Sequence, residues 1–97
     1  MMHYVYILEC EDGSYYTGYT TDPKRRIDQH FSGKGAKYTR SHKPIRMVYL
    51  EKHDEKKDAM SREWHIKHLS RREKEILILT SIENQLQFHH NDDKEDQ

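Results

Sequence analysis

One acidic side chain in the second half of the sequence occupies a position that suggests metal chemistry. At about 100° per helical residue, Glu63 falls inside the apolar arc of its segment, and that arc contains Ala59, Met60, Trp64 and Ile66. A carboxylate on a buried face is costly unless it pairs with a cation or binds a metal ion. Carboxylate oxygen is a suitable ligand for Mg²⁺ or Mn²⁺. Glu63 is therefore either the partner of an arginine from an earlier helix or a ligand for a hard divalent cation.

An arginine and a histidine nearer the N-terminus could act together on a phosphate. Arg26 and His30 are four residues apart, so they share one face of a helix. The planar guanidinium offers donors that match phosphate oxygens, and histidine can transfer a proton near neutral pH. Two ordinary surface side chains would show the same spacing, so the pair indicates phosphate chemistry only in combination with other residues.

Two tyrosines complete the set of side chains with reactive potential. Tyr6 and Tyr16 lie in neighbouring segments with strand character and could meet across a hairpin. The phenol of tyrosine has a pKa of about 10, so it acts as a base at neutral pH only beside a cation that favours phenolate. The alternative is that both are core aromatics with satisfied hydroxyls. The five residues together are nevertheless harder to assign to packing than any one of them.

The first part of the chain has the pattern of a hairpin followed by a helix. Residues 3–9 and 14–20 are rich in β-branched and aromatic residues, which predicts two strands, and Asp12-Gly13 between them is a hairpin turn signal. Gly18 inside the second strand is costly unless another group approaches the backbone closely there. A helix is predicted over residues 22–31, because its first two residues, Asp-Pro, form a helix start signal.

The second part of the chain contains a loop, a strand and two helices. Residues 32–44 form a basic, glycine-containing loop, and residues 45–50 are predicted to be a third strand. A helix is expected over residues 54–69, and the capping-box pattern Ser70-Arg71-Arg72-Glu73 predicts the start of the last helix. The resulting order, β-β-α-β-α-α, indicates an α+β fold in which helices flank a small three-stranded antiparallel sheet.

Length and composition limit the chain to one small domain. At 97 residues, 33% of them hydrophobic and 35% charged, the chain can bury only a modest core. Residues 1–83 are expected to form the domain and residues 84–97 a polar, disordered tail. The single cysteine, Cys10, excludes an internal disulfide, and His65 and His68 lack further ligands at zinc-finger spacing. Without a signal peptide or an apolar run of membrane-spanning length, the expected location is cytoplasmic.

The formal net charge of zero hides a local excess of positive charge. Residues 22–46 contain eight Lys or Arg against two Asp, whereas residues 91–97 contain four acidic residues against one lysine. A basic segment of this kind is a candidate contact surface for a polyanion, although a solvated loop explains the charge alone equally well. The residues predicted to contact nucleic acid are Gly18, Arg25, Lys34, Lys37, Tyr38, Arg40 and Lys43.

The two aromatic strand segments and the helix that follows them resemble the GIY-YIG nuclease superfamily. The motifs read Tyr4-Val5-Tyr6 and Tyr16-Thr17-Gly18, with Arg26 eight residues after the second motif. Residues 62–67 resemble the later helix that carries a metal-binding glutamate, and the whole resemblance covers residues 3–80. Tyr4 replaces the glycine of the first motif and Thr17 replaces the isoleucine of the second, and neither position supplies a catalytic side chain.

The resemblance implies a role for each candidate residue. Tyr6 would help to activate the attacking water, with Tyr16 and His30 positioning it or sharing the proton transfer. Arg26 would neutralise the scissile phosphate. Glu63 would hold a single divalent metal ion, Mg²⁺ or Mn²⁺, near the leaving oxygen.

The resemblance also implies the class of substrate. Residues 33–39 are similar to the loop of small stand-alone bacterial members and of structure-specific endonucleases that cut branched DNA. The expected function is a metal-dependent endonuclease that acts on nucleic acid, with DNA favoured and branched DNA as one candidate. Two alternatives stay open: a non-catalytic nucleic-acid-binding module on the same fold, and a nuclease subunit that needs a protein partner for specificity. No membrane partner is expected.

Overall fold

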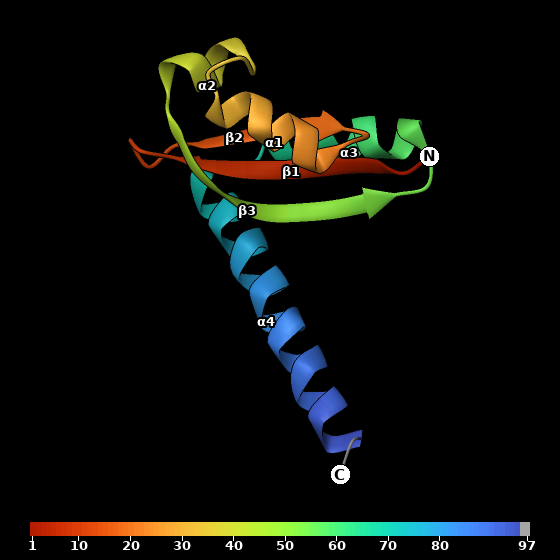
Figure 1. Cartoon of the computed structure of the whole chain (residues 1–97). Helices are drawn as coiled ribbons and strands as arrows, with labels where there is room; N and C mark the ends of the chain where they lie inside the picture. Colours follow the sequence, from red (N-terminus) through yellow and green to blue (C-terminus); the bar gives the residue numbers. More distant parts are fainter. Residues whose placement is uncertain (96–97) are drawn as a thin grey trace.

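A three-stranded antiparallel sheet forms the centre of the protein (Figure 1). The structure, a computed structural model, describes the backbone of residues 1–95 and the side chains of residues 1–83. The strands are β1 (His3–Cys10), β2 (Tyr15–Thr20) and β3 (Pro44–His53), and their order in the sheet is β2-β1-β3. Both neighbours run antiparallel to β1. β1 is therefore the central strand, and β2 and β3 form the two edges.

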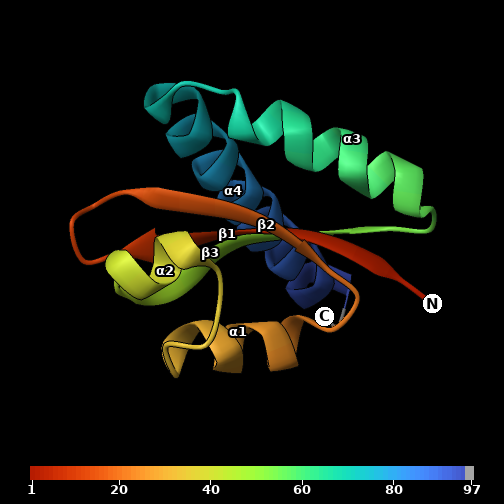
Figure 2. The ribbon, with the colours of Figure 1, turned by 90° about the horizontal axis from the view of Figure 1, so that it is seen from above.

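Helices cover both faces of this sheet (Figure 2). α1 (Pro23–Phe31) and α2 (Lys37–Ser41) lie on one face, and α3 (Lys56–Lys67) lies on the other. α4 (Arg71–Glu95) begins on the α3 side and leads away from the sheet past β3 (Figure 1). The α+β class and the order β-β-α-β-α-α are confirmed, and the short helix α2 is an addition inside the segment predicted to be a loop.

The alternation of side chains along β1 divides its residues between the two faces of the sheet. Val5 and Ile7 belong to the apolar core on the α3 side, where they pack with Ala59 and Ile66. Tyr6, between them in sequence, faces the opposite helices and is only 1% exposed. A strand covered on both faces is buried along its length, so the hydroxyl of Tyr6 has to find its hydrogen-bond partner inside the protein.

Three local signals act as predicted. Asp22 caps α1, because its Oδ1 accepts a hydrogen bond from the backbone N–H of Arg25 at 3.2 Å. Ser70 and Glu73 form the capping box of α4: the Ser70 N–H donates to Glu73 Oε1 at 2.9 Å, and the Glu73 N–H donates to Ser70 Oγ at 3.2 Å. Gly13 has a φ of +83°, the left-handed conformation that the hairpin turn between β1 and β2 requires.

The prediction for α3 is wrong in two respects. The helix begins at Lys56 rather than at Asp54, and the predicted apolar arc does not all face the sheet. Met60 is 41% exposed and Trp64 is 57% exposed, whereas Ala59 is fully buried. Periodicity identifies the apolar arc of a helix, but it does not say which part of that arc the sheet will cover.

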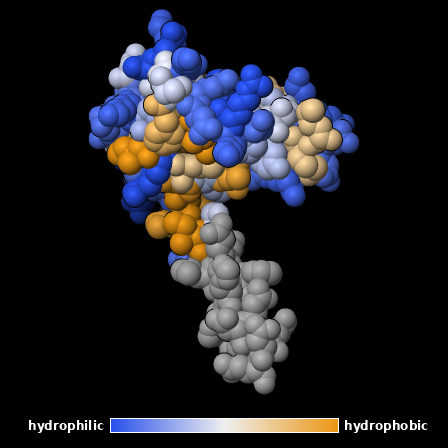
Figure 3. Space-filling view, in the orientation of Figure 1, coloured by the Kyte–Doolittle hydropathy of each residue, from blue (hydrophilic) through white to orange (hydrophobic). Residues whose placement is uncertain are grey.

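The last helix and the surface bear on two further predictions. The domain boundary at residue 83 stays a prediction, because the side chains of residues 84–97 lie outside the described part of the structure, while the backbone of α4 is helical to Glu95. Among the described residues, no helix combines the length and the hydrophobicity needed to cross a bilayer. On the face shown in Figure 3 the surface is mainly hydrophilic, and hydrophobic side chains gather below the sheet where α4 begins.

Candidate active site

The Tyr6 side chain lies directly over the backbone of the edge strand. Tyr6 of β1 pairs with Gly18 of β2 in the antiparallel register. A Cβ atom added at Gly18 would overlap the hydroxyl and the ring of Tyr6. The close approach predicted at Gly18 is therefore present, and the approaching group is the Tyr6 phenol. Because Gly18 has no side chain, the phenol can extend from the central strand to the edge of the sheet.

The ring of His30 lies at the centre of a buried chain of hydrogen bonds. Its Nε2 is 2.8 Å from the Oη of Tyr6, and its Nδ1 is 2.6 Å from the Oγ1 of Thr39. Thr39 donates from the same Oγ1 to the backbone carbonyl of Ala36 at 3.0 Å. His30 and Thr39 are 1% and 2% exposed. The chain thus connects β1, α1 and α2 through groups that are shielded from water.

Burial controls the protonation of both groups at the Tyr6–His30 contact. Desolvation, followed by the positive charge of Arg26, lowers the pKa of His30 to about 4. Desolvation raises the pKa of Tyr6 to about 12, and Arg26 opposes this rise. At neutral pH the imidazole is therefore uncharged and the phenol keeps its proton.

Two oppositely charged side chains act on the Tyr6 phenol from different helices. Arg26 of α1 lowers the pKa of Tyr6 by hydrogen bonding and by its charge, whereas Glu63 of α3 raises that pKa by its charge. α1 and α3 lie on opposite faces of the sheet (Figure 2), and α3 packs against β1 and β2. Charges carried by helices on opposite faces of the sheet thus act on one phenol, whose ring lies against the backbone of β2.

Each of these two charged side chains also has a polar partner on its own helix. Arg26 Nη1 donates to Gln29 Oε1 at 3.0 Å. Glu63 Oε1 lies 3.7 Å from Lys67 Nζ, and the Glu63 side chain is 15% exposed. The sequence left open a salt bridge between Glu63 and an arginine of the first helix. Its ion pair is instead with a lysine one turn further along α3.

Tyr16 joins the same cluster through its ring. The centroid of its ring is 6.3 Å from that of Tyr6 and 5.3 Å from that of His30. Tyr38 of α2 stacks on Tyr16 with the ring centroids 5.8 Å apart, and His42 stacks on Tyr38 at 4.0 Å. The rings of Tyr16 and Tyr38 therefore pack α2 against β2, next to the rings of Tyr6 and His30. The structure thus brings Tyr6, Tyr16 and His30 together. The charge of Arg26 acts on Tyr6 and His30, and the charge of Glu63 acts on Tyr6.

A comparison with known proteins places this arrangement in a family. Residues 2–76 match the model of the GIY-YIG catalytic domain. The chain belongs to the GIY-YIG family. It is 62% identical over 78 residues to a UPF0213 protein of Halalkalibacterium halodurans, and the aligned region covers 80% of this chain and 83% of the relative. It is also 55% identical over 77 residues to a UPF0213 protein of Halobacterium salinarum, and the aligned region covers 79% of this chain and all of the relative.

Solved structures of GIY-YIG relatives share the fold. The solution structure of a UPF0213 protein from Bacillus halodurans superposes with a TM-score of 0.55 at 60% sequence identity, over 82% of this chain and 85% of the other. The solution structure of a protein from E. faecalis superposes with a TM-score of 0.58 at 44% identity, over the same shares of the two chains. Membership of the GIY-YIG family implies a nuclease superfamily and an association with nucleic acid.

A GIY-YIG nuclease is expected to use a divalent metal ion, and the donor groups of the site limit how such an ion could be held. In the described part of the chain, no group of three or more His, Cys, Asp or Glu side chains is arranged to bind a metal. Glu63, the carboxylate predicted from the sequence to bind a metal ion, acts on the Tyr6 phenol by its charge. Mg²⁺ in nucleic-acid enzymes is commonly held by one or two carboxylates, waters and substrate phosphates. The site fits that mode of binding and does not fit a zinc centre built from protein ligands.

Exposed basic side chains surround the helices on the Tyr6 side of the GIY-YIG domain. Five of the predicted nucleic-acid contacts are exposed on α1, on α2 or in the adjoining loops: Arg25, Lys34, Lys37, Arg40 and Lys43. Lys43 Nζ lies 3.9 Å from Glu11 Oε1, a weak surface pair. Tyr38, which is also predicted to contact nucleic acid, is half-buried and already packs on His42.

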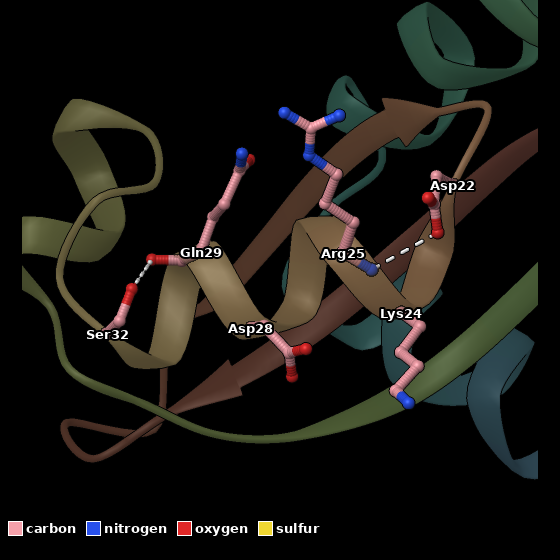
Figure 4. Close-up of a pocket in the computed structure, with 6 residues that line it drawn as sticks. All are labelled: Asp22, Lys24, Arg25, Asp28, Gln29 and Ser32. Atoms are coloured by element: carbon pink, nitrogen blue, oxygen red, sulfur yellow. Dashed lines mark hydrogen bonds between the residues drawn. The ribbon is translucent and has the colours of Figure 1, made fainter.

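A shallow pocket lies on the outer side of α1 (Figure 4). It is lined by Asp22, Lys24, Arg25, Asp28, Gln29 and Ser32. Figure 4 shows Arg25 and Gln29 on one side of the helix and Lys24 and Asp28 on another. None of the five predicted catalytic residues lines this pocket, and its charges are mixed, so the pocket is not part of the candidate site.

Two residues of the site were missed by the sequence analysis. Thr39 contacts His30 from α2, and a Cβ atom added at Gly35 would overlap the backbone and the ring of His30. Gly35 lies in a basic loop where a glycine has many explanations, and a threonine next to Tyr38 is not distinctive. Only the fold of residues 32–44 over His30 reveals that both positions are constrained.

Proposed function

We propose that this GIY-YIG protein is a metal-dependent endonuclease that hydrolyses phosphodiester bonds in nucleic acid, with DNA as the favoured substrate. The observation that carries this proposal is the buried hydrogen bond between Tyr6 and His30, together with the charges that act on the Tyr6 phenol, so that four chemically distinct groups are coupled. These are the phenol of Tyr6, the imidazole of His30, the guanidinium of Arg26 and the carboxylate of Glu63. Packing alone requires none of these groups to be close to another.

The Tyr6 hydroxyl is the group best placed to take a proton from the attacking water. Its own proton can pass to His30 Nε2, 2.8 Å away, so the phenol can accept one proton while it releases another. Tyr16 packs on both rings and holds them in place. Neither an isolated phenolate nor an isolated imidazolium is favourable in this buried site, and a concerted transfer does not require the isolated phenolate.

Arg26 is the group that would bind the scissile phosphate. Its charge acts at the Tyr6 phenol, and fixed positive charge beside a phosphate is commonly the largest contribution to such a reaction. A bound phosphate would also offset the unfavourable influence of Arg26 on a protonated His30. Glu63 is the residue that would hold Mg²⁺ or Mn²⁺. Such an ion, when bound, stabilises the negative charge that develops on the leaving oxygen.

The basic surface beside the site suits a nucleic acid backbone. Arg25, Lys34, Lys37 and Arg40 are exposed on the α1–α2 side of the sheet. Contacts from such residues to phosphates supply affinity and orientation but little sequence information. A domain of this size therefore either recognises a DNA shape, such as a branch, or obtains specificity from a protein partner.

One observation favours a second candidate function, a binding module without turnover. The pKa of Tyr6 is raised to about 12 and that of His30 is lowered to about 4, so neither group is poised to act as a base at neutral pH in the free protein. A module of this kind would bind nucleic acid with a strong dependence on salt and would not cut it.

A cleavage assay separates the two functions. Purified protein is incubated with supercoiled plasmid, branched DNA and RNA in the presence of Mg²⁺ or Mn²⁺, and the wild type is compared with Glu63→Gln and Tyr6→Phe. Glu75→Gln is a matched control, because Glu75 pairs with Arg71 on α4 and takes no part in the site. Cleavage by the wild type and the control, but not by the two site variants, supports the nuclease. Salt-sensitive binding without cleavage of any substrate supports the binding module.

A further inference from the structure

The hydrogen bonds around His30 determine which of its nitrogens carries the proton. Both ring nitrogens have partners: Tyr6 Oη at Nε2 and Thr39 Oγ1 at Nδ1. A neutral imidazole has one N–H donor and one acceptor nitrogen. His30 is neutral at pH 7 because its pKa is lowered to about 4 by desolvation and by Arg26. If one of the two partners can only accept a hydrogen bond from His30, the ring nitrogen that faces this partner must carry the proton.

Thr39 is that partner. Its hydroxyl has a single hydrogen, and its Oγ1 lies 3.0 Å from the carbonyl oxygen of Ala36. A carbonyl only accepts, so the hydroxyl hydrogen is directed to Ala36. The Oγ1 of Thr39 is then left with lone pairs for His30, and Nδ1 must be the donor. It follows that Nε2 has no proton and accepts a hydrogen bond from the hydroxyl of Tyr6.

We propose that Thr39 is a positioning residue for the reaction: it holds His30 in the Nδ1–H form and thereby makes Tyr6 the donor in the Tyr6–His30 hydrogen bond. This inference rests on the proposed function for its consequence, but the tautomer itself does not depend on turnover. With the Tyr6 hydrogen directed to His30, the oxygen of Tyr6 keeps its lone pairs free for Arg26 and for the attacking water.

The proton transfer from Tyr6 to His30 is possible only in this tautomer. A hydrogen of the attacking water moves to Tyr6 Oη as the hydrogen of Tyr6 moves to His30 Nε2, and His30 becomes an imidazolium that still donates from Nδ1 to Thr39. The water oxygen forms its bond to phosphorus while the bond from phosphorus to the leaving oxygen breaks. The leaving oxygen keeps the electron pair of that bond and takes a proton from solvent, and His30 then returns its Nε2 proton to solvent. In the opposite tautomer Nε2 already carries a hydrogen, so it cannot receive the hydrogen of Tyr6.

The local structure holds Thr39 at this position. α2 begins after Ala36, and the backbone around Gly35 approaches His30 so closely that no larger residue fits without a shift. Thr39 is 2% exposed, although its neighbours Lys37 and Arg40 are exposed. A threonine that only filled space would not need its hydroxyl placed between an imidazole N–H and a carbonyl.

Nitrogen-detected NMR on the uniformly ¹⁵N-labelled full chain at neutral pH reports the tautomer directly, because protonated and unprotonated ring nitrogens have well-separated shifts. The wild type is expected to show His30 protonated at Nδ1 and unprotonated at Nε2. Thr39→Val keeps the shape but removes the acceptor, and a population protonated at Nε2 is expected to appear. Thr39→Ser keeps the hydroxyl and is expected to keep the wild-type form. A wild type protonated at Nε2, or a folded Thr39→Val with an unchanged tautomer, overturns the inference.

Tyr6→Phe provides a test that does not require the Thr39 variants to fold. If Thr39 determines the tautomer, His30 stays protonated at Nδ1 when the Tyr6 hydroxyl is removed. A switch to Nε2–H in this variant would show that Tyr6 determines the tautomer, and the proposal would be wrong.

Kinetics then test the consequence for catalysis. For Thr39→Val the turnover number on whichever substrate the wild type cleaves is expected to fall about 10- to 100-fold, a part of the usual contribution of proton transfer, with little change in the Kd for DNA. Thr39→Ser is expected to recover most of the rate. A switched tautomer with an unchanged turnover number contradicts the positioning role. If the wild type cleaves nothing, the nuclease proposal fails, and the NMR result still decides whether Thr39 sets the tautomer.

Discussion

Acidification is expected to destabilise the folded protein through His30. In the unfolded chain His30 has its ordinary pKa of 6.5, and in the folded protein that pKa is about 4, because the ring is desolvated and lies near Arg26. As the pH falls below 6.5 the unfolded chain binds a proton that the folded protein does not, so the free energy of unfolding decreases until the pH reaches about 4. Each pKa unit corresponds to about 1.4 kcal/mol, so the full loss is about 3 kcal/mol.

Urea unfolding at a series of pH values measures this effect. The free energy of unfolding is determined for the wild type and for His30→Gln, and their difference is followed with pH, since most other titrating groups contribute equally to both proteins. Tyr6, the hydrogen-bond partner of His30, has a pKa of about 12, so it does not titrate in this range. Between about pH 7 and pH 5 the free energy of unfolding of the wild type is expected to fall by about 2 kcal/mol relative to that of His30→Gln. A difference that stays constant over this range would refute the assignment of His30 as a neutral, desolvated imidazole.

Three other predictions test the architecture and the metal ligand. Gly18→Ala is expected to destabilise the protein by about 1–3 kcal/mol, as overpacking does, and to displace Tyr6; an unchanged urea midpoint would mean that the phenol does not lie over the β2 backbone. Ser70→Ala removes one half of the α4 capping box and is expected to cost about 0.5–2 kcal/mol without affecting the site, so any loss of cleavage beyond the loss of folded protein would contradict this separation. Addition of Mg²⁺ or Mn²⁺ is expected to change NMR signals near Glu63 and Tyr16 in the wild type but not in Glu63→Gln, and equal changes in both proteins would place the metal elsewhere.

The local signals in the sequence are sufficient to predict most elements of the fold. Asp22 and Ser70 cap helices through hydrogen bonds to amides within three residues, and Gly13 adopts the positive φ of its turn. These interactions are short-range, so neighbouring residue types determine them. The short helix α2 was not predicted, because it depends on the packing of Tyr38 and Thr39 against residues far away in sequence.

The candidate site was predicted only in part. The residue types of Tyr6, His30 and Arg26 and their spacing predicted that these side chains take part in chemistry, and that role stays a prediction. The structure places Tyr6 and His30 within hydrogen-bonding distance, and the charge of Arg26 acts on both. For α3 the periodic pattern indicated that Glu63 lies on a partly buried side, but it also included Trp64, which is exposed. A hydrophobic pattern describes one helix, whereas burial depends on where the sheet meets that helix.

By itself the sequence determined the kinds of reactive groups, the order of the elements and the family to which the chain belongs. Only the tertiary structure decided that the Tyr6 ring lies over Gly18, so that helices on opposite faces of the sheet can act on one hydroxyl. It also decided that Thr39 contacts His30 and so selects the protonated nitrogen. The reason is physical: protonation and charge in a buried site depend on distances and desolvation between distant parts of the chain, and local sequence patterns carry no information about them.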